Sequence, residues 1–305
     1  MKKLFFMMLF FISINAKEWQ LQNIFFQIEN DADFRTDRDY THGGEMGALY
    51  QTHTNTYISF SYAQQMFTPE DFDEENIDFT KERPYAGYMY LGGGYHTVEN
   101  TILTSYNIQI GFVGPSVKMD KIQKAIHSLI GAHDPQGWDE QIKDEPIFQF
   151  NIEQRYFFQQ PQLFSYYQNI IPYWGINLGN ASTKAVVGGI YRLSYQPVFD
   201  FGASRVDYRG YNNIPLSKKD NNDINFIVSL WIEGSIVARD IFLDGNTFKD
   251  SVHVDKEILV AKGGFGLGFK YQKFLIEWIR TFSTKEFKTQ DYYHSYGSLL
   301  LSYSF

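Results

Sequence analysis

The stretch SYNIQIGF, Ser105–Phe112, alternates strictly between polar or small residues and large apolar ones. Because successive side chains of a β-strand point to opposite faces, it predicts a strand with one apolar face. The same alternation returns at Ile58–Tyr62, Phe148–Glu153, Asn225–Glu233 and Leu299–Phe305. It is typical of a transmembrane β-barrel, whose strands face lipid on one side and a polar lumen on the other, but soluble β-sandwiches alternate as well.

The composition favours the barrel over the sandwich. Aromatic residues make up 18% of the chain, with 22 Tyr and 28 Phe, as expected for the aromatic girdles of barrels. After the N-terminal segment there is no run of about eighteen apolar residues, so a helical membrane protein is excluded. The net charge of −8 argues against a nucleic-acid partner, and a chain without cysteine has no disulfides.

The N-terminus predicts export. Lys2 and Lys3 precede the apolar run Leu4–Ile12, and Ala16 ends a short approach to a cleavage site. This pattern is typical of a secretory signal peptide. We therefore expect a signal peptide at residues 1–16, a single barrel domain at residues 17–305, and the outer membrane of a Gram-negative bacterium as the destination.

The whole chain predicts an all-β fold, a transmembrane antiparallel barrel of about twelve strands, an even number as in bacterial barrels. With both termini in the periplasm, the extracellular loops are residues 30–41, 67–84, 114–145, 240–255 and 285–291. Periplasmic turns should be short, and 196–223 breaks this rule, so it is either a long connection or a hidden pair of strands. The expected strands are 19–29, 42–51, 55–66, 85–97, 101–113, 146–158, 166–179, 184–195, 224–239, 256–270, 272–284 and 292–305.

Two of the expected extracellular loops are acidic. The first carries four aspartates between Asp31 and Asp39, next to Asn30. Carboxylate and amide oxygens are ligands for Ca²⁺, but the spacing is not that of an EF-hand. A solvated acidic loop with Asx-turns explains the same residues. The second acidic run, within 67–84, can also be explained as a solvated loop.

The third loop breaks the β pattern. Residues 117–130 predict an amphipathic helix, with Met119, Ile122, Ile126 and Leu129 on an apolar stripe and Gln123 and His127 on the polar side. His127 is a candidate general base because the pKa of histidine lies near neutrality. The alternative is a surface histidine on a plug helix. The chain contains no G-x-S-x-G elbow and no H-E-x-x-H zinc motif.

Four ordered motifs resemble a known family. They are E-N-D-x-x-F with T-D-x-x-Y-T-x-G (29–43), R-P-Y-A-G-Y (83–88), G-F-V-G-P (111–115) and Q-x-x-x-H-x-x-x-G-x-x-x-P-x-G-W-D-x-Q (123–141). In this order they resemble the outer-membrane lipid A 3′-O-deacylases. The resemblance is dense over residues 23–145 and sparse in the C-terminal half.

The resemblance implies a twelve-stranded barrel with a helix in an extracellular loop. It implies a Ca²⁺-dependent enzyme that hydrolyses the ester-linked 3′-acyloxyacyl group of lipid A in lipopolysaccharide. By position, His127, Asn30 and Thr41 match the catalytic residues, and Asp31 with Asn30 matches the metal site. The family's carboxylate after the helix falls at His133, beside Asp134, and Lys81 is the nearest match to a loop lysine.

Two other functions remain open from the residues alone. An outer-membrane phospholipase needs a serine nucleophile beside a histidine; Ser128 adjoins His127, and Ser61 is also available. A porin or adhesin barrel fits acidic loops and a plug helix equally well. The ordered motifs favour the deacylase.

Overall fold

The computed structural model describes residues 19–31, 38–70, 77–131, 134–202, 206, 213–216 and 224–305. The expected signal peptide at residues 1–16 lies outside these ranges. So do residues 32–37 and 71–76 of the two acidic loops, and His133.

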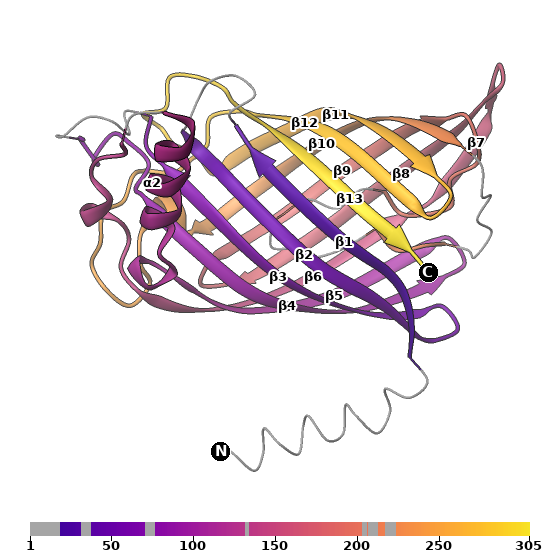
Figure 1. Ribbon diagram of the computed structural model, residues 1–305, viewed down its shortest axis with the longest axis horizontal. Coiled ribbons are helices and arrows are strands. Elements are labelled where there is room, and N and C mark those ends of the chain that lie inside the picture. The colour runs from indigo at the N-terminus through magenta and orange to yellow at the C-terminus, as the bar shows by residue number, and fades with distance from the viewer. Residues whose placement is uncertain are drawn as a thin grey trace, which may run out of the picture.

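The wall is one antiparallel sheet whose first and last strands, β1 and β13, pair over Asn23–Asn30 and Gly297–Ser304, so the sheet closes into a barrel (Figure 1). Strands that follow each other along the chain are paired, except for β6 and β7. The strands are β1 (Gln20–Asn30), β2 (Asp39–His53), β3 (Thr56–Thr68), β4 (Ala86–Glu99), β5 (Ile102–Val113), β6 (Glu145–Tyr156), β7 (Phe158–Leu163), β8 (Tyr166–Gly179), β9 (Ser182–Ser194), β10 (Asn225–Asp240), β11 (Leu259–Tyr271), β12 (Phe274–Ser283) and β13 (His294–Ser304).

The thirteen strands fill twelve positions in the ring. The exception is β7, which follows β6 after the single residue Phe157 and pairs only with β8. Because β6 itself pairs with β8 over Gln149–Arg155, β7 lengthens one hairpin and adds no wall position. The expected twelve-stranded antiparallel barrel is therefore confirmed.

The two faces of the wall follow the alternation of the sequence. In β1, Ile24, Phe26 and Ile28 are exposed on the outside, whereas Phe25 and Gln27 are buried in the lumen. In β5 the exposed residues include Ile108 and Ile110, with Asn107 and Gln109 buried between them. An outer apolar face and a polar lumen are what a lipid environment requires of a barrel.

The helices gather at one end of the barrel, which we call the loop end. There α2 (Met119–Ile130) stands across the ends of β2, β3 and β4, while the C-terminus lies at the opposite, terminal end (Figure 1). The short helices are η3 (Pro115–Val117), η4 (Trp138–Glu140) and α3 (Ile241–Asp244). Within the described residues, no helix has the length and apolar character needed to cross a membrane. The helix expected at 117–130 is therefore present, and it lies in the loop between β5 and β6.

The long connection between β9 and β10 turns back into the lumen. We call its described residues, 196–202, 206 and 213–216, the plug. Phe201 and Ile214 are fully buried against lumen-side residues such as Phe25 and Leu300. The plug holds one isolated bridge, between Asp200 and Pro215, so its described part contains no further wall strands.

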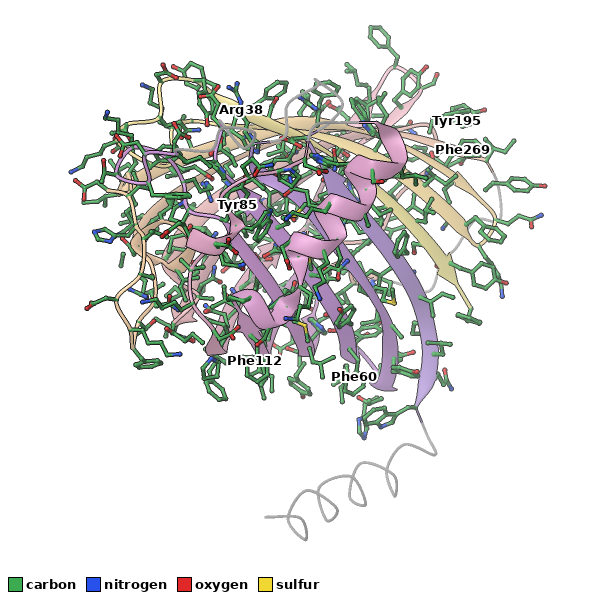
Figure 2. The ribbon with its side chains drawn as sticks, turned by 60° about the vertical axis from the view of Figure 1, so that its left-hand side comes forward. Arg38, Phe60, Tyr85, Phe112, Tyr195 and Phe269 are labelled. Carbon is green, nitrogen blue, oxygen red and sulfur yellow. The ribbon has the colours of Figure 1, made fainter. Side chains whose placement is uncertain are left out.

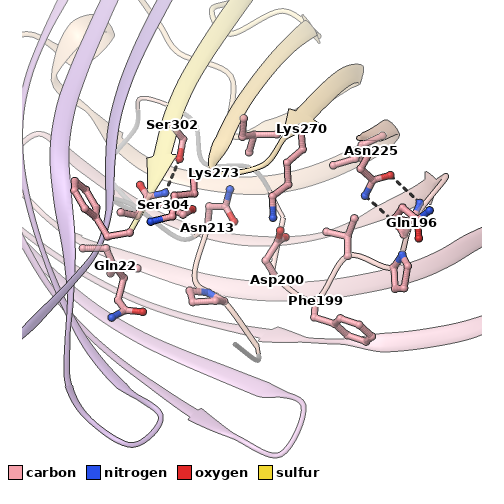
Figure 3. Close-up of a pocket in the computed structure, with 18 of the residues that line it drawn as sticks. Gln22, Gln196, Phe199, Asp200, Asn213, Asn225, Lys270, Lys273, Ser302 and Ser304 are labelled. Carbon is pink, nitrogen blue, oxygen red and sulfur yellow. Dashed lines mark hydrogen bonds between the residues drawn. The ribbon is translucent and has the colours of Figure 1, made fainter. Parts of the chain in front are cut away.

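Figure 3 shows the terminal mouth of the barrel, where Phe199, Asp200 and Asn213 of the plug lie among the strands. A cavity of about 490 Å³ remains there between the plug and the wall. At the other end of the plug, Val206 accepts a 2.9 Å hydrogen bond from Gln65 Nε2. The plug therefore reaches from the terminal mouth towards the loop end.

Candidate active site

The end of β1 places Asn30 on the outer face of the barrel. Ile28 is exposed, Glu29 is fully buried in the lumen, and Asn30, next in the alternation, is half-buried on the outer side. Across the β1–β2 ladder Asn30 is paired with His42, and side chains that face each other in this way are close neighbours. The wall therefore carries two neighbouring polar side chains on its outer face at the end of β1.

A β-bulge in β2 adds Thr41 to this part of the wall around Asn30 and His42, which we call the corner. The register with β3 shifts between Tyr40, which pairs with Phe67, and His42, which pairs with Met66. Thr41 is the extra residue, and its Oγ1 lies 2.6 Å from Oγ1 of Thr68. Bulges re-aim side chains, and here the bulge lets Tyr40 enter the lumen while Thr41 meets the edge of β3.

Asp31 follows Asn30 at the point where β1 ends. Its side chain is 1% exposed, and Oδ2 accepts a 2.8 Å hydrogen bond from the backbone N–H of Arg38. Residues 32–37 between them lie outside the described ranges. In the described chain no group of three or more His, Asp or Glu side chains forms a metal cluster.

Two of the four motifs dock α2 onto the outside of the wall. The indole N–H of Trp138 donates a 2.7 Å hydrogen bond to Gln123 Oε1 on α2, and the Trp138 ring lies 4.6 Å from that of Tyr85. On β4, Gly87 makes room for Met119, because a Cβ there would lie 2.8 Å from Met119 Cγ. The motifs therefore describe one docked unit, in which residues far apart in the chain contact each other.

The buried side of α2 only partly coincides with its apolar stripe. Met119, Gln123 and His127, spaced four residues apart, are 2%, 1% and 5% exposed. Within the apolar stripe, Met119 is buried and Ile122 is packed against the same cluster, whereas Leu129 is 86% exposed. The side that the sequence marks as polar is therefore buried at Gln123 and His127.

His127 therefore lies on the side of α2 that faces the wall. From Met119, which contacts Gly87 on β4, eight residues of helix advance about 12 Å. Strands lie about 4.8 Å apart, and α2 runs across them in both views (Figures 1 and 2). The helix thus carries His127 from β4 towards β2, which bears Thr41 and His42. Gly131, with φ at +71°, ends the helix one turn later.

The other matched positions differ in their placement. Lys81 is well exposed and pairs with Asp78, 2.9 Å away on the same loop. Asp134 is exposed, and His133 lies outside the described residues. His42 fills the variable position of the Y-T-x-G motif, so the motif does not mark it as a site residue. The alternation of β2 around the bulge was the signal that placed it beside Asn30.

Under this corner, on the lumen side, lies a network of buried charges. Arg83 of the R-P-Y motif is 1% exposed; it bonds Asp39 at 3.2 Å and forms an ion pair with Glu286. Although burial opposes its charge, Glu286 and Asp39 raise the pKa of Arg83. Burial alone would raise the pKa of Glu286, but Lys262 and Arg83 outweigh it and hold that pKa well below its ordinary value.

Comparisons with known proteins identify the family of the chain and match its fold. Residues 4–305 match the model of the family described as outer membrane protein LpxR. LpxR from Salmonella typhimurium superposes with a TM-score of 0.81 at 18% identity, over 93% of this chain and 100% of that one. The NalP translocator domain of Neisseria meningitidis has a TM-score of 0.41 at 11% identity, over 100% of this chain and 95% of that one.

Comparison with curated protein sequences gave no match. The family model nevertheless spans nearly the whole chain, including all four motifs and the strands of the wall. This chain belongs to the outer membrane protein LpxR family.

Proposed function

We propose that this protein is a lipid A 3′-O-deacylase of the outer membrane, which hydrolyses the ester-linked 3′-acyloxyacyl group of lipid A. The observation that carries the proposal is the placement of Asn30, Thr41, His42 and His127. Asn30 and His42 are paired on the outer face of the wall, Thr41 lies next to His42 in the bulge of β2, and His127 is buried on the outer helix α2. Polar residues on the lipid face of a barrel are costly, so their presence there favours a site that acts on a membrane lipid.

His127 is the proposed general base. Its side chain is buried between α2 and the wall, where it would take a proton from a water molecule attacking the ester carbonyl. The N–H₂ of Asn30 would donate a hydrogen bond to the developing oxyanion. The Thr41 hydroxyl is hydrogen-bonded to the Thr68 hydroxyl, and it would hold the β2 side of the site in position. A positioned base of this kind raises the reaction rate by about 10²–10⁴-fold.

Asp31 and Asn30 are the proposed calcium ligands. Their donors are carboxylate and amide oxygens, which Ca²⁺ prefers, and backbone and water oxygens commonly complete its coordination. The donor types therefore fit, although one oxygen of Asp31 already accepts the Arg38 N–H. A bound Ca²⁺ would polarise the ester carbonyl.

Of the rival functions, a pore has no support from the lumen. The plug occupies it from the terminal mouth to Gln65, and the network around Arg83 lies at the loop end. A phospholipase remains the competing enzyme, because it too would act at the lipid-facing side.

The test is the mass spectrum of lipid A and of phospholipids from cells with and without the protein. Loss of a 3′-acyloxyacyl group supports the deacylase. Altered phospholipids with intact lipid A support the phospholipase, and no change in either contradicts both enzymes. The His127→Ala variant, made at the same level, is the control for catalysis.

A further inference from the structure

One buried carboxylate lies directly behind the candidate site. Glu29 is fully buried on the lumen side of β1, next to Asn30 on the outer side. Its Oε1 accepts hydrogen bonds from Gln27 Nε2 at 2.9 Å, Ser298 Oγ at 2.9 Å and the backbone N–H of Val206 at 3.2 Å. Three separate parts of the chain, β1, β13 and the plug, therefore meet at one side chain.

The Y-T-x-G motif supplies a fourth partner. Gly43 lies opposite Glu29 in the β1–β2 ladder, and the Tyr40 side chain passes over it to hydrogen-bond Glu29. A Cβ on Gly43 would lie 1.8 Å from the Tyr40 hydroxyl oxygen, so only glycine leaves this path open. Tyr40 is in turn fixed edge-on against Tyr296, with ring centroids 4.9 Å apart.

Val206 is held from both sides of β2. Its N–H bonds Glu29 on β1, and its carbonyl accepts a hydrogen bond from Gln65 on β3 at 2.9 Å. The plug thus links the two strands that flank the one carrying Thr41 and His42.

The base of the plug is anchored equally firmly. Arg192 forms an ion pair with Asp200 and also donates a 2.8 Å hydrogen bond to its carbonyl oxygen. Arg155 Nη1 donates to the carbonyl of Phe201 at 2.8 Å. These contacts fix the described plug residues at the terminal end of the lumen.

We propose that Glu29 is a positioning residue and that the plug acts through it, holding the loop end of β1 so that Asn30 keeps its orientation on the outer face and Asp31 keeps its place at the end of the strand. The inference rests on the proposed deacylase function. Neighbouring residues of a strand share one peptide plane between them, so a rotation at Glu29 turns Asn30 as well. A displacement of about 1 Å in a catalytic group can cost about 10²-fold in rate.

The test uses the full-length chain with Glu29→Gln and Val206→Pro. Glu29→Gln keeps the shape but removes the charge that accepts these donors, and Val206→Pro removes one donated N–H. Their matched controls are Glu277→Gln, another buried lumen glutamate whose charged neighbours are Arg192 and Asp200, and Val206→Ala. Retention of the compact, heat-modifiable form on gel electrophoresis shows that each barrel folds.

Two readouts decide the outcome. We expect both test variants to lose about 10- to 100-fold in kcat with KM for lipid A within about twofold, and the controls to stay near wild type. Because the chain has no cysteine, a single spin label at His42→Cys can report the mobility of the corner, which should rise only in the test variants.

Wild-type kcat and unchanged label mobility in Glu29→Gln would overturn the inference. Equal losses in Glu277→Gln would also overturn it, since they would show a general effect of lumen charge. If the wild-type chain releases no acyl group, the proposed function fails, and the label mobility still decides whether the plug holds this corner.

Discussion

The two faces of the wall at the loop end use polar residues in opposite ways. On the lumen side, Arg83 and Lys262 pair with Asp39 and Glu286 in one buried network. On the outer side, Asn30 and His42 interrupt a lipid-facing surface, next to Thr41 in the bulge of β2. A polar lumen is ordinary in a barrel, whereas a polar patch on the outside needs a purpose. The comparison teaches that the location of polar residues, more than their number, marks the site.

The sharpest way to break this comparison is to remove the metal. If Asp31 and Asn30 hold Ca²⁺, chelation should abolish lipid A deacylation, and added Ca²⁺ should restore it, because hard oxygen donors are selective for such cations. The lumen network around Arg83 does not involve the metal, so chelation should leave the barrel folded. Full activity in excess chelator, with the metal shown to be absent, would contradict the calcium site.

The next largest effect is expected at His127. Replacement by Ala should lower kcat by about 10²–10⁴-fold, the contribution of a positioned base, while the barrel still folds because α2 lies outside the wall. Lys124→Ala, an exposed position on the same helix, is the matched control. If His127→Ala keeps wild-type activity while His133→Ala is inactive, the base has been assigned to the wrong histidine.

A smaller effect should come from undocking α2 without touching the site. Gly87→Leu would push against Met119, whose Cγ lies 2.8 Å from an added Cβ, and should lower activity by about tenfold through misplacement of His127. Gly93→Leu on the same strand is the control, since its Cβ meets only Ile108 at 3.7 Å. Equal activity of the two variants would show that catalysis does not depend on the docking of α2.

The smallest effect should appear on the lumen side, in stability and not in activity. The pKa of Glu286 is depressed below its ordinary value by Lys262 and Arg83, which outweigh burial. Its contribution to stability is therefore complete above that ordinary value of about 4.5 and is lost as the pH falls towards the folded-state pKa. The Tm difference between wild type and Glu286→Gln should narrow below about pH 4.5 in thermal melts. Exposed Glu140→Gln should show no such change, and a constant difference for Glu286→Gln would contradict the network.

Much of the fold was predictable from alternation. The strand around Ser105–Phe112 and the helix at 117–130 were both found, because each has a period that one segment shows by itself. The split of the sixth strand at Phe157 and the fate of residues 196–223 were not, because they depend on contacts with distant strands.

The candidate site, like the fold, was predictable from the sequence only in part. Motif order alone drew attention to Asn30, Asp31, Thr41 and His127, which remain proposals as catalytic and metal residues. The burial of Gln123 and His127 could not be predicted from the apolar stripe of α2, because Ile126 and Leu129 of that stripe are exposed. Both His42 and Glu29 lie within the first motif, but their places beside and behind Asn30 emerged only from the register of β1 with β2.

The sequence by itself determined the closed antiparallel barrel and the family, because alternation and motif order are local and linear. Only the tertiary structure decided which face of the wall carries the site, which stripe of α2 is buried and where the plug ends. These depend on a bulge at Thr41, on space left at Gly43 and Gly87, and on a hydrogen bond between Glu29 and Val206, which lie 177 residues apart. Contacts at such distances along the chain exist only once the barrel has closed.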